Sequence, residues 1–193
     1  MTTESVYALV PVWRTDTAAA RRLYGFSDDL SADDIHKAVE QVRFQRQGQA
    51  RAPLWLQALA GFAWAQAQPA QVHWQEQDEE REVLLALVKA IDTQPEATIL
   101  VFSQAADLAQ RLRLRLLLQG LAPQFANSWD SRLRDGQAWQ PEGLSLESDA
   151  AAAVLSLATT QNCYDPWQTS GPSPQQACQQ AQALCELWQR GWL

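Results

Sequence analysis

Few residues in this chain combine a reactive type with a spacing that would let them act together. His36 and His73 are isolated, one in a segment of helical periodicity and one in an alternating strand pattern, which is more typical of surface or internally satisfied histidines than of a ligand pair. Ser103 and Ser173 have no base at a spacing suited to nucleophilic catalysis, and the sequence has no phosphate-binding glycine loop. Carboxylates therefore remain as the candidates for chemistry.

Clustered carboxylates are what a magnesium or manganese site would require, because these ions prefer carboxylate oxygens. The acidic run from Glu76 to Glu82 opens a segment of helical periodicity. Acids in a first helical turn stabilise the helix dipole, so this run predicts a solvated helix start rather than a metal site. Asp107 lies in another expected first turn, where the same explanation accounts for it.

The elements that would position these residues can be read from hydrophobic periodicity. Val6 to Trp13 predicts a buried strand, in which Pro11 indicates a bulge or an early end. Ser31 is suited to cap a helix that continues to about Arg46. Two strands follow, Leu56 to Gln66 and Gln71 to Gln75.

The second half of the chain begins with the helix that follows the acidic run and with an apolar strand, Thr98 to Phe102, which should be covered on both faces. The remaining expected elements are a helix over about Ala106–Gln119 ending at Gly120, an ambiguous stretch at 129–143 with room for one short strand, a helix over 149–157, a loop over 162–174 and a last helix capped by Ser173, Pro174 and Gln176. This order predicts an α/β fold with a mixed sheet of about five strands.

Two segments carry a resemblance to a known family: Thr15 to Phe26 (TDTAAARRLYGF) and Ala97 to Gly120 (ATILVFSQAADLAQRLRLRLLLQG). They resemble the predicted 3′–5′ exonuclease family related to the proofreading domain of B-type DNA polymerases, within the DnaQ-like (DEDD) superfamily. The resemblance implies an RNase H-like fold, and it extends from about Val6 to Gly191 with a shortening between Phe125 and Pro174. It also implies four acids that hold two metal ions.

This chain departs from the family at most of those acids. The first two positions fall near Val10 and Val12, or near Pro11 and Trp13 if the alignment is shifted by one, and neither register supplies an acid. Asp107 matches the third position, although the neighbouring Asn and glycines are missing. At the fourth motif Cys178 fits the Cys, which places Ala177 at the Tyr and Ala181 at the Asp. A single carboxylate cannot hold a metal pair.

Composition favours one domain over residues 1–193, with a helical insertion at about 31–47. The net charge of −7 argues against binding nucleic acid through bulk charge, although a local basic groove is compatible with it. The cysteines Cys163, Cys178 and Cys185 form no CxxC pair and are typical of free thiols in a reducing compartment. With no long apolar run and no basic leader, a cytoplasmic location without a membrane partner is expected.

Basic and aromatic residues suggest two binding surfaces. The densest basic group consists of Arg111, Arg113, Arg115, Arg132 and Arg134. Arg111 and Arg115 share a helix face that could touch a phosphate backbone, although such a stripe is more often solvated or paired with acids. The tryptophans expected in loops or at the terminus, Trp129, Trp139, Trp167 and Trp192, suggest a protein contact or a stacking surface.

The sequence thus predicts a catalytically degenerate exonuclease-like domain that needs no cofactor. Its role would be that of a binding or regulatory module, with another protein as the favoured partner and nucleic acid as the second possibility. The alternative is an active exonuclease that uses magnesium or manganese and recruits Asp16, Asp107, Asp149 or Asp165. A third reading is an unrelated α/β protein.

Overall fold

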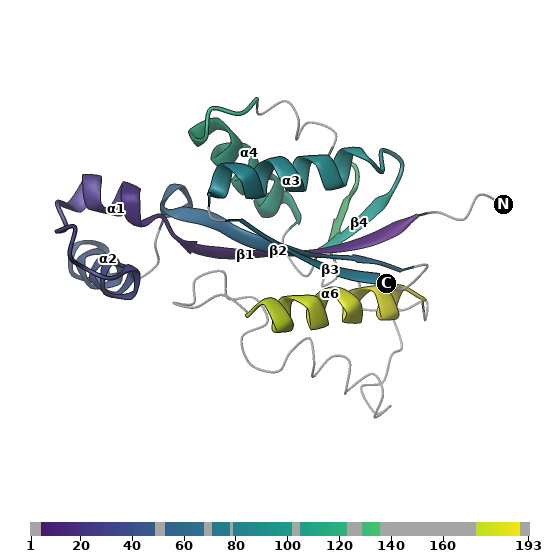
Figure 1. Ribbon diagram of the computed structural model, residues 1–193, viewed down its shortest axis with the longest axis horizontal. Helices are drawn as coiled ribbons and strands as arrows, with labels where there is room; N and C mark the ends of the chain where they lie inside the picture. The colour runs from purple at the N-terminus through teal and green to yellow at the C-terminus, as the bar shows by residue number, and fades with distance from the viewer. Residues whose placement is uncertain are drawn as a thin grey trace.

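The computed structural model describes residues 5–48, 53–67, 71–77, 79–101, 105–122, 129–135 and 173–189. Its centre is a five-stranded mixed sheet in the order β3-β2-β1-β4-β5 (Figure 1). The strands are β1 (Val6–Thr15), β2 (Gln57–Gln66), β3 (Gln71–Glu76), β4 (Thr98–Val101) and β5 (Leu133–Asp135). β1 and β3 run antiparallel to β2, whereas β4 runs parallel to both β1 and β5. The predicted mixed sheet of about five strands is confirmed, and the strand predicted over Thr98–Phe102 is described as β4 up to Val101, in the interior of the sheet beside β1.

Pro11 lies within β1, opposite Phe62 of β2. The described pairing of β1 with β4 covers Val6 to Leu9, and its pairing with β2 extends to Thr15. The register with β2 shifts between Val12 and Trp13, so the expected irregularity is present two residues further along.

Side chains of β1 alternate between two apolar layers, as a buried strand requires. Tyr7, Leu9 and Trp13 belong to the layer formed with α3 (Glu80–Asp92) and α4 (Ala105–Leu118). The layer formed with α6 (Pro174–Gln189) takes Val6, Ala8, Val10 and Val12 from the same strand. Figure 1 shows α3 and α4 on one face of the sheet and α6 on the other. The last helix therefore packs against the sheet as predicted.

Helices α1 (Thr17–Tyr24) and α2 (Ala32–Gln47) lie beyond the end of the sheet (Figure 1). They have a small core of their own, made of Ala20, Ile35, Val39 and Leu56, the last of which comes from the short 3-10 helix η1 (Leu54–Leu56). Ser31 caps α2 by accepting a hydrogen bond from the backbone N–H of Asp34 at 3.1 Å. The helix predicted over about 31–47 is therefore present as α2.

Capping residues also mark the ends of α4 and α6. Gly120, at φ 66°, follows the end of α4, where a left-handed residue is needed. Ser173 and Gln176 form the predicted capping box of α6: the Gln176 amide oxygen accepts from the Ser173 N–H at 2.8 Å, and the Ser173 hydroxyl oxygen accepts from the Gln176 N–H at 3.3 Å. Residues 129–143 contribute one short strand, β5, up to residue 135. The helix expected at 149–157 and the loop expected at 162–172 lie outside the described residues.

Trp129 corrects one expectation, because it is fully buried rather than available as a surface aromatic. It belongs to the layer under α3 and α4. Trp139, Trp167 and Trp192 lie outside the described residues. Among the helices that the structure describes, none is both long and apolar enough to cross a membrane.

Candidate functional site

The most distinctive polar feature of the molecule is a buried arginine. Arg115 on α4 is 1% exposed. Its Nε donates to Glu80 Oε1 at 2.7 Å, its Nη2 donates to Glu80 Oε2, and the same Nη2 donates to Asp16 Oδ2 at 2.9 Å. Its Nη1 donates to the backbone oxygen of Trp55 at 2.8 Å. One guanidinium therefore connects α4, α3, the end of β1 and η1.

The two carboxylates bonded to Arg115 are occupied on both oxygens. Glu80 Oε1 also accepts from the backbone N–H of Leu59 at 2.7 Å, and Glu80 Oε2 accepts from the side-chain amide of Gln119 at 2.6 Å. Asp16 Oδ1 accepts from the N–H of Ala19 at 2.9 Å, which caps α1. Because each oxygen has a donor, this cluster positions chain segments rather than offering open coordination sites.

The electrostatics of the cluster favour a charged arginine. Burial alone is the largest influence and lowers the pKa of Arg115, since desolvation penalises the cation. The hydrogen bonds and charges of Glu80, followed by those of Asp16, outweigh burial and leave the pKa of Arg115 raised. Breaking such a pair would leave an uncompensated buried charge, which typically costs about 3–5 kcal/mol.

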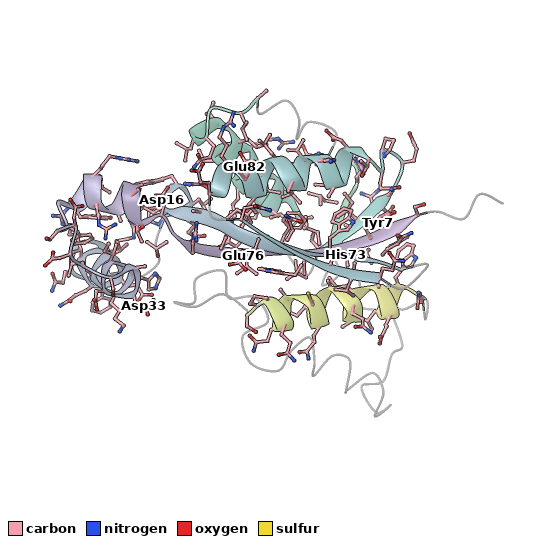
Figure 2. All side chains as sticks on the ribbon, in the orientation of Figure 1. Tyr7, Asp16, Asp33, His73, Glu76 and Glu82 are labelled. Carbon is pink, nitrogen blue, oxygen red and sulfur yellow. The ribbon has the colours of Figure 1, made fainter. Side chains whose placement is uncertain are left out.

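A cavity of about 580 Å³ opens beside this cluster. It is lined by the end of β1, by part of β2 and by the first turns of α1, α2 and α3. Three acids line it, namely Asp16, which caps α1, and Asp33 and Glu80, which lie in the first turns of α2 and α3. Asp16 and Glu80 accept hydrogen bonds from Arg115, and Asp33 offsets the dipole of α2. Figure 2 shows Asp16 at the junction of β1 and α1, apart from His73 on β3.

His36 is the one histidine in the lining of the cavity. Its Nδ1 is hydrogen bonded to the Thr15 hydroxyl, and its tautomer decides which of the two donates. Its Nε2 lies 3.3 Å from Glu40 Oε1, on the next turn of the same helix, although it has no partner with hydrogen-bond geometry. His36 therefore ties α2 to the end of β1.

The four degenerate positions are brought together by the fold. Val10 and Val12 on β1 and Ala177 and Ala181 on α6 belong to a single buried apolar cluster. Ala177 and Ala181 are 0% exposed. Carboxylates at these positions would be desolvated, whereas methyl groups pack there without cost.

Asp107 does not join this cluster. It is exposed in the first turn of α4, whose buried neighbours Leu108 and Ala109 belong to the opposite layer. Within the described ranges, no group of three or more His, Cys, Asp or Glu residues is arranged to hold a metal ion. Among the described residues, Asp107 therefore belongs to no group of three or more potential metal ligands.

Most of the arginines predicted to form a phosphate-binding face are not exposed on the surface. Arg111 is 3% exposed, donates to the side-chain oxygen of Gln57 at 3.3 Å and lies over the Trp13 ring at 6.0 Å. Arg132 is half-buried and donates to the backbone oxygens of Ile91 at 3.1 Å and of Gln94 at the end of α3, so desolvation lowers its pKa. Of the predicted phosphate-binding residues, Arg134 alone is exposed. Arg115 instead pairs with acids, which was the alternative interpretation of the arginines on this helix face.

The sequence contained a signal for this cluster that residue-by-residue reading missed. Glu80 is spaced four and seven residues from Leu84 and Leu87, so it shares the apolar face of α3. Arg115 is likewise spaced with Leu108 and Leu112 on the apolar face of α4. Opposite charges placed on two apolar helix faces predict a buried pair once the two helices cover the same face of a sheet.

Taken together, these contacts describe a charged cluster that is complete within the fold and an apolar cluster between β1 and α6. Neither arrangement supplies an acid or base aimed at a substrate. Comparisons with protein-family models, with curated proteins and with solved structures found no match to this chain.

Proposed function

We propose that this chain is a degenerate DnaQ-like exonuclease domain that has lost its catalytic metals and works as a binding module. The order of its elements is that of an RNase H-like core. The five-stranded mixed sheet, with a helix pair on one face and α6 on the other, supports this assignment. The resemblance of Thr15–Phe26 and Ala97–Gly120 supports it independently.

The observation that carries the proposal is the apolar cluster between β1 and α6. Alignment on the family motifs selects Val10, Val12, Ala177 and Ala181 from opposite ends of the chain, and these residues pack in one cluster. The same alignment also selects Asp107, which lies on α4 over the other face of the sheet, so the support comes from the β1 and α6 positions alone. Their apolar types remove three of the four acids of the motif.

Without those acids the chemistry has no electrostatic basis. Two metal ions stabilise phosphodiester cleavage by neutralising the charge that develops on the attacking and leaving oxygens. Among the described residues, one exposed carboxylate, Asp107, cannot recruit them, and the candidates Asp149 and Asp165 lie outside the described residues. Asp16, a candidate substitute, already accepts hydrogen bonds from Arg115 and from the N-terminus of α1.

The proposal is tested by incubating the purified protein with end-labelled single-stranded DNA and RNA, in magnesium and in manganese. We expect no shortening of either oligonucleotide. Metal-dependent shortening that disappears in Asp107→Ala would overturn the proposal in favour of the active exonuclease. Shortening that persists in Asp107→Ala would be assigned to a contaminating nuclease.

A further inference from the structure

The arm formed by α1, α2 and η1 has an apolar recess that its own core does not use. The recess has a volume of about 220 Å³ and is lined by Leu23, Tyr24, Val42, Arg43, Arg46 and Trp55. Leu23 is 52% exposed and Trp55 is 39% exposed. The core of the arm is already filled by Ala20, Ile35, Val39 and Leu56. The exposure of Leu23 and Trp55 is therefore not explained by folding of the arm.

The charge around the recess is opposite to that of the whole protein. Among the described residues, Arg43 and Arg46 line it and no carboxylate does. Asp33 and Asp34 lie in the first turn of α2, and Glu40, one turn before Arg43, has its carboxylate 3.3 Å from His36 Nε2. In a chain of net charge −7, this is a local basic site. Its complement is an acidic ligand.

The backbone at Trp55 is fixed by hydrogen bonds from the cluster around Arg115. Its backbone oxygen accepts the 2.8 Å hydrogen bond from Arg115, and the backbone oxygen of the next residue, Leu56, accepts one from the N–H of Asp16 at 2.7 Å. The indole is therefore presented by a fixed backbone, which lowers the entropic cost of binding. Tryptophan and arginine are the residue types that most often dominate binding energy in protein interfaces.

The size of the recess indicates what it would hold. Pockets for whole small molecules usually measure about 300–1,000 Å³, so about 220 Å³ suits one side chain instead. Single-stranded nucleic acid requires successive aromatic platforms along a basic groove. Here the described arginines nearest the sheet, Arg111 and Arg115, are buried, so these two residues extend no basic groove from the recess.

We infer that this recess binds an acidic segment of a partner protein, with one apolar side chain inserted between Leu23 and Trp55 and carboxylates facing Arg43 and Arg46. The inference deepens the proposed binding role by giving it a surface and a class of partner, and it rests on that role. Exonuclease activity in the oligonucleotide assay would refute the proposed function without changing what the recess binds. If the recess binds no acidic peptide, the proposal that the protein lacks nuclease activity is unaffected.

The test is selection from a random peptide library displayed on phage, with the full-length protein as bait, followed by affinity measurements on synthetic versions of the enriched peptides. We expect the enriched peptides to be acidic with one aromatic or aliphatic anchor, and to bind more weakly at high salt. Trp55→Ala should weaken binding about tenfold or more, and Arg43→Ala/Arg46→Ala should weaken it and reduce its salt dependence. Leu117→Ala is the matched control, because Leu117 is 61% exposed on α4 and does not line the recess, and it should change nothing.

Three outcomes would overturn the inference. One is the absence of enriched acidic peptides. Another is binding that Trp55→Ala leaves unchanged while the variant keeps the wild-type melting temperature. The last is tighter binding of an oligodeoxythymidine than of any selected peptide, with the same dependence on Trp55, which would assign the recess to nucleic acid.

Discussion

At the scale of single residues, charge placement decides what this molecule can do. Arg115 reaches two carboxylates and a backbone oxygen through a planar fork that lysine cannot reproduce. Glu80 was predicted to be a solvated first-turn acid and is instead 7% exposed. The burial of Glu80 could not be predicted from its own helix alone. It depends on α3 and α4 covering the same face of the sheet, and these helices are distant in the sequence. The spacing of Glu80 and Arg115 within apolar stripes was the available signal.

Arg115→Met should lower the free energy of unfolding by about 3 kcal/mol or more, because it leaves Glu80 buried without its cation. Urea denaturation measures this loss. The control is Arg113→Met on the same helix, where the 2.6 Å pair with Asp130 is exposed and should contribute less than about 1 kcal/mol. Adding Glu80→Leu to Arg115→Met should recover part of the loss. Equal losses in the two single variants would contradict a buried, structural pair.

Cys185 should make stability depend on alkaline pH. Burial among the β1 and α6 side chains raises the pKa of this thiol from 9.0 to about 11. As pH rises, the thiol therefore ionises in the unfolded chain before it ionises in the folded protein. The contribution of the buried thiol to the free energy of unfolding is complete below pH 9 and is lost as pH rises toward 11. Between pH 8 and pH 10, wild type should lose about 1 kcal/mol more than Cys185→Ala in urea denaturation. Identical pH dependence in the two proteins would show that the thiol is accessible to water.

At the scale of elements, local signals predicted most of the fold. Ser31, Gly120 and the Ser173–Gln176 box mark helix ends through contacts within a few residues, so sequence spacing is sufficient to find them. The short apolar run from Val6 to Trp13 predicted a buried strand, and β1 confirms it. Burial of Arg111 and Trp129 could not be read in the same way, because it depends on which distant element covers them.

The β1–α6 layer should reject an acid at the position where the family carries one. Ala181→Asp would place a carboxylate among Val10, Val12 and Ala177, and should cost at least about 2 kcal/mol of unfolding free energy at neutral pH. The loss should shrink at acidic pH, where the carboxyl is neutral. The control Gln179→Asp introduces the same residue at an exposed position of α6 and should cost little. A tolerated Ala181→Asp would mean that water and ions reach this layer.

At the scale of the whole molecule, the charged residues serve architecture more than a substrate. The net charge is −7, yet the arginines nearest the sheet are internal and paired, and the local basic site lies on the arm. The sheet and α6 enclose the apolar cluster that we propose replaces a metal site, and the arm carries the recess that we assign to an acidic partner. A protein that keeps this scaffold without its acids would be stable without metal, because no cluster of carboxylates has to be neutralised.

The most direct test is the melting temperature of the full-length protein titrated with manganese, compared with that of Asp107→Asn. A ligand raises the melting temperature only if the native state has a site for it. We predict that millimolar manganese does not change the melting temperature of either protein. A saturable rise in wild type that is absent in Asp107→Asn would show that a metal site has been built around Asp107, and it would contradict the account of a degenerate, non-catalytic domain.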